Sequence, residues 1–115
     1  MNPGDARVAL FPAISAAATR CGYALGIHES FGGAMELIAA PWVPEACAGE
    51  KLIRALAASI GLAESQIFGP FNRPFGRLGY ALCVASDMQF LVNVIPRYTV
   101  FKIVAPVHEA QGAAS

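Results

Sequence analysis

The chain has 115 residues, of which 56% are hydrophobic and only 14% are charged, and its formal net charge is zero. This composition excludes a disordered chain and predicts a single folded domain over residues 1–115. The zero net charge argues against general binding to nucleic acids, because such binding needs a basic surface.

The first half of the chain predicts a helix followed by a β-hairpin. Asp5 is the expected N-cap of a helix from Ala6 to Cys21, and Gly22 is expected to end it. Because Pro12 lies inside this range, we expect it to kink the helix or to mark its true start. Two strands are expected at 23–27 and 34–40. The glycine-containing segment between them predicts an antiparallel connection.

The second half predicts another helix, a loop and several strands. Apolar residues at three- and four-residue spacing predict a helix within 45–61, centred on 50–60. The Gly- and Pro-rich segment 68–77 (FGPFNRPFGR) predicts a loop. Expected strands then occupy 78–85, 88–95 and 98–104, with a hairpin turn at 86–87.

This order of elements predicts an α+β fold. We expect an antiparallel or mixed sheet of about five strands, with two helices packed on one of its faces. Residues 1–4 and 108–115 lie outside all expected elements, and we expect them to be flexible.

The segment from Tyr23 to Trp42 is typical of the nucleotidyltransferase fold, with strand, Gly/Ser turn and acidic strand. The sequence resembles a group of small phage- and prophage-encoded proteins with a nucleotidyltransferase-like core. The matching pieces are YALGIHES at 23–30, ELIAAPW at 36–42, RPFGRLGYAL at 73–82 and VIP at 94–96. The resemblance implies that fold, with Ser30, Gly32 and Gly33 in a turn whose backbone N–H groups face phosphate.

The acidic positions that the resemblance implies are largely replaced. The D-x-D pair falls on Ala34 and Glu36, the third acidic position falls near Leu91, and Glu29 stands where the family has glycine. Transfer chemistry needs two or three oxygen ligands to hold Mg²⁺. We therefore expect a non-catalytic protein without a metal. The alternative is a metal-dependent nucleotidyltransferase that uses Glu36 and Glu29, with Mg²⁺ as its cofactor.

Ser30 also allows a second enzymatic interpretation. Residues 28–32 nearly match the G-x-S-x-G motif, and Ser30, Asp87 and His108 follow the Ser–Asp–His chain order of hydrolases. No helix is expected after the turn, however, so a serine that satisfies backbone groups in the turn is the commoner interpretation.

Aromatic and basic residues mark two candidate binding surfaces. In the segment 68–77, Arg73 and Arg77 with Phe71 and Phe75 are suited to stacking a base or holding a phosphate. The simpler interpretation is a connector pinned by its aromatic side chains, with solvated arginines. Trp42 is expected to be an anchor in the core or in an interface.

The three cysteines are an odd number and are widely spaced, which predicts reduced thiols in a cytoplasmic protein. No C-x-x-C or H-x-x-x-H spacing is present, so no zinc site is expected. The side chains that could bind zinc are those of Cys21, Cys47, Cys83, His28 and His108. No apolar run reaches the roughly 18–20 residues needed to cross a bilayer, so no membrane segment is expected.

These patterns together predict a non-catalytic binding protein of phage or mobile-element origin, which modulates a host protein or a defence system. The surplus of apolar residues predicts a protein partner or a homodimer. The expected binding surface is an exposed sheet edge or the loop that carries Arg73 and Arg77.

Overall fold

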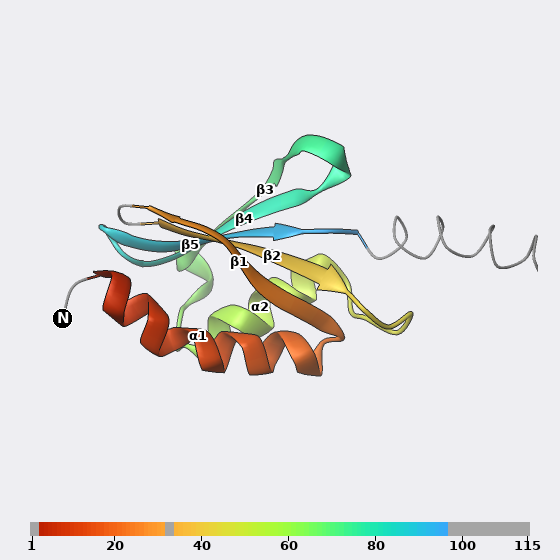
Figure 1. Ribbon diagram of the computed structural model, residues 1–115, viewed down its shortest axis with the longest axis horizontal. Helices are drawn as coiled ribbons and strands as arrows, with labels where there is room; N and C mark the ends of the chain where they lie inside the picture. The colour runs from red at the N-terminus through yellow and green to blue at the C-terminus, as the bar shows by residue number, and fades with distance from the viewer. Residues whose placement is uncertain (1–2, 32–33, 97–115) are drawn as a thin grey trace, which may run out of the picture.

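The computed structural model describes residues 3–31 and 34–96. Its elements are α1 (Pro3–Arg20), β1 (Tyr23–Phe31), β2 (Ala34–Pro41), α2 (Gly49–Ser59), η1 (Glu64–Gln66), β3 (Ile67–Asn72), η2 (Pro74–Gly76), β4 (Leu78–Ala85) and β5 (Met88–Val94). Both helices lie on one face of the sheet (Figure 1). The α+β class, with helices on one face of a five-stranded mixed sheet, is therefore confirmed.

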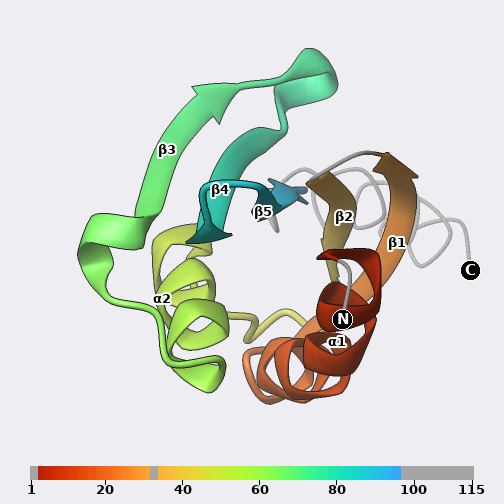
Figure 2. The same ribbon diagram turned by 90° about the vertical axis from the view of Figure 1, so that its left-hand side faces the viewer.

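The sheet has the strand order β1-β2-β5-β4-β3. β2 and β5 are parallel, and all other neighbouring pairs are antiparallel. Because parallel strands need a long connection, the chain between β2 and β5 passes through α2, β3 and β4. β3 and the adjoining part of β4 bend away from the helices (Figures 1 and 2).

The core lies between the sheet and the helices. Leu37 and Val92 on the central strands, and Leu52 and Leu56 on α2, are fully buried there. Each such side chain contributes about 1.5–3 kcal/mol by leaving water. Because side chains alternate along a strand, the residues next to Leu37 and Val92 face the other side of the sheet, which carries no helix.

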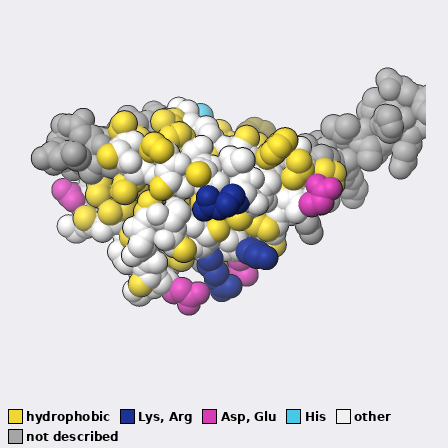
Figure 3. Space-filling view, turned by 90° about the horizontal axis from the view of Figure 1, so that it is seen from below, with side chains coloured by type: hydrophobic (Ala, Val, Ile, Leu, Met, Phe, Trp, Pro, Cys, Tyr) yellow, Lys and Arg dark blue, Asp and Glu magenta, His cyan; other side chains and the backbone are white. Residues whose placement is uncertain are grey.

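The helix side still exposes apolar groups. Seen from that side, hydrophobic side chains show over much of the surface, and basic ones gather near its middle (Figure 3). Within the described residues, no helix has the length and apolar character needed to cross a membrane.

The first helix differs from the prediction at its start and at its proline. α1 begins at Pro3, so Asp5 is inside the helix and the prediction of an N-cap there was wrong. The helix also continues through Pro12, which neither starts nor ends it. The carbonyl that Pro12 leaves without a helical donor belongs to Val8, whose side chain is 62% exposed, so water reaches this side of the helix.

Two segments that were expected to be turn or loop are strand. β1 extends to Phe31, with an irregularity between Ile27 and Glu29. Residues 67–72 form the edge strand β3, although they contain Gly and Pro. An edge strand tolerates both residues, and the pairing is interrupted between Phe68 and Phe71. The strand predicted at 98–104 and the tail at 108–115 lie outside the described residues.

Candidate functional site

Glu36 and Asn93 form a buried polar pair on the side of the sheet that faces away from the helices. Glu36 alternates with buried Leu37 on β2 and is 8% exposed, whereas Asn93 lies on β5 and is 2% exposed. The parallel register pairs Asn93 with Ile38, and Glu36 with Leu91. Glu36 and Asn93 are therefore diagonal neighbours on adjacent strands.

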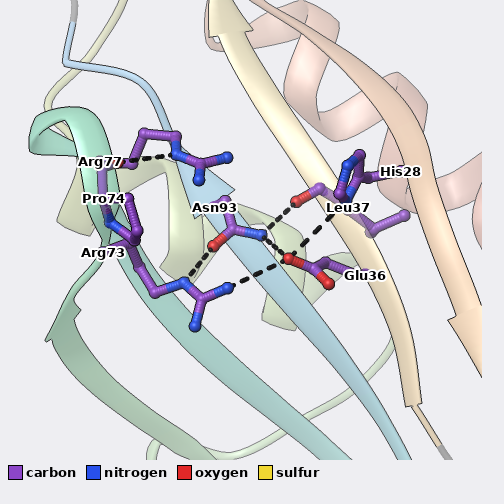
Figure 4. A network of polar contacts seen from close by, with 7 residues as sticks. All are labelled: His28, Glu36, Leu37, Arg73, Pro74, Arg77 and Asn93. Carbon is purple, nitrogen blue, oxygen red and sulfur yellow. Dashed lines mark hydrogen bonds and ion pairs between the residues drawn. The ribbon is translucent and has the colours of Figure 1, made fainter.

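Asn93 uses both ends of its amide. Its Nδ2 donates to Glu36 Oε1 at 2.8 Å and to the Leu37 carbonyl at 3.3 Å. Its Oδ1 accepts from Arg73 Nε at 3.0 Å, and Arg73 Nη2 donates to Glu36 Oε1 at 3.3 Å. Figure 4 shows this closed set of contacts, in which each of the three side chains bonds to the other two.

Arg73 reaches the pair by crossing β4 at a glycine. Gly79 is the register partner of Asn93 on β4. A Cβ atom at Gly79 would lie 3.0 Å from Arg73 Cγ and 3.1 Å from its Cδ. These distances are tighter than ordinary van der Waals contact, so the arginine stem lies against the backbone where a side chain would otherwise stand.

His28 approaches the same carboxylate from β1. Its Nδ1 lies 3.8 Å from Glu36 Oε1, which is beyond hydrogen-bond distance, and its side chain is 52% exposed. Glu29 is the register partner of Glu36 across the hairpin. The imidazole therefore borders the buried carboxylate on the side opposite Arg73.

The charge of Glu36 is balanced within the chain. Oε1 receives hydrogen bonds from Asn93 and Arg73, and the guanidinium supplies the positive charge that a metal ion would otherwise supply. Among residues 3–31 and 34–96, no group of three or more His, Cys, Asp or Glu side chains is placed to hold a metal ion. A cation binding at Oε1 would have to compete with Arg73.

The residues predicted in segment 68–77 separate into two groups. Arg73 belongs to the network around the buried Glu36 and Asn93, whereas Arg77 donates from Nε to the Pro74 carbonyl at 3.0 Å. Phe71 and Phe75 are 51% and 92% exposed, so the prediction that aromatic side chains pin this segment was wrong. Phe75 also has a φ of +64°, a conformation that is uncommon for a residue with a side chain.

The remaining predicted residues lie elsewhere. Ser30 is on β1, paired with Met35, and Gly32 and Gly33 are outside the described residues, as is His108. Asp87 is exposed in the turn between β4 and β5. Trp42 follows β2 and is 60% exposed, so it is not a core residue.

Sequence reasoning missed Asn93 and Gly79. The available signal for Asn93 was a polar residue between two apolar ones in a strand, which places it on the face opposite the core. Gly79 had no comparable signal, because its role depends on a side chain six residues earlier that folds back over β4.

A hollow of about 140 Å³ lies beside this network. Phe71, Arg73, Leu91 and Asn93 are among the residues that line it. It combines an aromatic side chain, an apolar one and a cation. Comparison with protein-family models, curated proteins and solved structures gave no match to this chain.

Proposed function

We propose that the chain is a non-catalytic binding protein of phage or mobile-element origin, built on a degenerate nucleotidyltransferase-like core, and that it modulates a host protein. The origin and the core rest on the sequence resemblance. The absence of catalysis rests on the occupied carboxylate of Glu36. We infer that the binding surface is the helix-free face of the sheet together with the β3 edge.

The observation that carries this proposal is the engagement of Glu36 by Arg73 and Asn93. A catalytic carboxylate in a metal-dependent transferase must present its oxygens to the ion. Here Oε1 already accepts two hydrogen bonds, one of them from a cation at 3.3 Å. The network is therefore suited to hold Arg73 and the β3 edge in place.

The exposed aromatic residues supply the contact surface. Phe68 and Phe71 on β3 are 50% and 51% exposed, and Phe75 is 92% exposed just beyond that strand. Aromatic side chains dominate the binding energy of protein interfaces when a partner covers them. Their position on an edge strand also leaves backbone groups for an added strand from the partner.

Two measurements test this proposal. Calorimetry with Mg²⁺ and a nucleoside triphosphate is expected to show no saturable heat with the wild-type chain. In affinity capture from cells of the natural host, a Phe71→Ser/Phe75→Ser variant is expected to lose about tenfold or more of the binding to any captured partner. Val8→Ser, an exposed site on α1, is the matched control and is expected to bind like wild type. Equal capture by all three chains would contradict the assigned surface.

One observation favours a second candidate, a metal-dependent nucleotidyltransferase. The β1–β2 register places Glu29 opposite Glu36, and acidic residues on paired strands are a feature of metal sites. This candidate predicts Mg²⁺-dependent nucleotide binding that Glu36→Gln abolishes. It also predicts tighter metal binding in Arg73→Gln, because that variant removes the competing cation.

A further inference from the structure

Cys21 and Cys47 lie together although 26 positions separate them. Cys21 follows α1, Cys47 precedes α2, and the backbone N–H of Cys47 donates to the Cys21 carbonyl at 3.0 Å. Both thiols are free and half-buried. Both residues line one hollow of about 390 Å³.

The backbone around the pair is held from several sides. Gly22 has a φ of +87°, and a Cβ atom there would lie 2.8 Å from the Cα of Ala46. Trp42 N–H donates to the Gly22 carbonyl at 3.0 Å, and the Tyr23 hydroxyl donates to the Cys47 carbonyl at 2.7 Å. The two segments are therefore fixed against each other before any covalent bond joins them.

The side chains of Cys21 and Cys47 interact with each other. Burial, a hydrogen bond with the Cys21 side chain and the charge of Cys21 raise the pKa of Cys47 to about 11, against a smaller opposing effect of Lys51. Cys47 is therefore a thiol at neutral pH. Arg20 and Lys51 line the same hollow.

We propose that Cys21 and Cys47 form a dithiol site that low-molecular-weight disulfides, such as glutathione disulfide, oxidise to an intramolecular disulfide. A backbone N–H···O=C bond of 3.0 Å joins the two residues directly. Such a bond keeps two Cα atoms within about 7 Å of each other, and a disulfide spans Cα separations of about 4.4–6.8 Å. The backbone therefore needs no large movement to close the bond.

The exchange proceeds in two balanced steps. The Cys21 thiolate attacks one sulfur of glutathione disulfide, which forms a mixed disulfide and releases one glutathione thiolate. Cys47 then loses its proton to solvent, and its sulfur attacks the Cys21 sulfur and releases the second glutathione. The two protein thiols are oxidised by two electrons, and one glutathione disulfide is reduced to two glutathione molecules.

The third cysteine provides an internal control. Cys83 lies on β4, and its Sγ is 3.8 Å from Gln89 Oε1. Its hydrogen-bond partner is Gln89 and not a second thiol, so Cys83 is not placed to form the same bond. We expect Cys83 to remain a thiol, or to carry a reducible glutathione, where the other two form a bond.

The test is peptide mapping of the full chain after equilibration with glutathione redox buffers and quenching by alkylation. The proposal predicts a peptide that contains Cys21 joined to Cys47, in a monomer that has lost two hydrogens. It also predicts a rise in melting temperature of roughly 10–20 °C, because the bond closes a long loop in the unfolded chain. Cys83→Ser is expected to behave like wild type, and Cys21→Ser is expected to lose the rise.

Three results would overturn the proposal. One is the alkylation of both thiols in an excess of glutathione disulfide. Another is a separate glutathione adduct on each of them. The last is a disulfide that joins two chains in place of Cys21 and Cys47. Because the mapping uses the wild-type chain, a variant that fails to fold leaves the conclusion unaffected.

Discussion

Removal of the Arg73 guanidinium is the most informative single change, because it isolates the charge of Glu36. Arg73→Met keeps much of the apolar stem that lies over Gly79, while it deletes the donors to Glu36 and Asn93. Of the two side chains that donate to the Glu36 carboxylate, Asn93 alone is then left.

The distance and the exposure set the size of the effect. Two unit charges 3.3 Å apart attract by about 1.3 kcal/mol in bulk water and by about 5 kcal/mol at an effective dielectric constant of 20. The Arg73 side chain is 43% exposed and that of Glu36 only 11%, so solvent screens the pair from one side. We expect Arg73→Met to lower the free energy of unfolding by about 1–2 kcal/mol.

The assay is a double-mutant cycle with Arg73→Met, Glu36→Gln and the double variant, each unfolded in urea and followed by far-ultraviolet circular dichroism. Once the carboxylate is neutral, loss of the arginine should cost less, so we expect a coupling free energy of about 1 kcal/mol. Arg77→Met is the matched control, because the Arg77 guanidinium donates to the Pro74 carbonyl and not to Glu36 or Asn93. A coupling near zero, or an equal cost for Arg77→Met, would refute the assignment of Arg73 as the counter-charge of Glu36.

Three further predictions concern the backbone, the core and the response to pH. Gly22→Ala should lower the free energy of unfolding in urea by about 2–4 kcal/mol, because Gly22 has a φ of +87° and an added Cβ atom would lie 2.8 Å from the Cα of Ala46. Gly26→Ala is the control and should be near neutral, because an added Cβ atom there meets nothing within 4 Å. Equal costs for the two variants would be evidence against the close approach. Leu82→Ala should cost about 2–5 kcal/mol because Leu82 is fully buried, and a loss below about 1 kcal/mol would argue against that core position. Burial and the charge of Glu50 raise the pKa of Tyr80 above its usual value of 10.0. The folded state therefore favours the protonated phenol, and the stability that this contributes is present below pH 10 and is lost as pH rises further. Tyr80→Phe should flatten this fall in the urea midpoints, and an unchanged fall would contradict the role of Tyr80.

Local patterns in the sequence predicted most of the elements. The strand predicted at 78–85 and the turn predicted at 86–87 match β4 and the connection to β5, because both depend on neighbouring residues alone. The β1–β2 hairpin and α2 follow for the same reason. β3 was missed because Gly and Pro in a short segment are typical of loops, and only pairing with β4 makes that segment a strand.

The site was harder to predict because it depends on register between distant strands. Glu36 was identified from its place after the turn, but its contact with Asn93 requires β2 and β5 to be parallel neighbours. Arg73 was identified as a surface cation. The contact of its stem with β4 depends on Gly79, and sequence spacing does not reveal which side chain occupies the space above a glycine.

The central claim is that Arg73 and Asn93 occupy Oε1 of the Glu36 carboxylate, so that a metal ion at this oxygen would have to compete with Arg73. The most direct measurement follows the side-chain amide signals of Asn93 in ¹⁵N–¹H spectra during titration with Mn²⁺, with and without a nucleoside triphosphate. We expect these signals to keep their positions and line widths, because Asn93 Nδ2 stays bonded to Glu36 and Leu37. Saturable broadening of these signals that disappears in Glu36→Gln would contradict it.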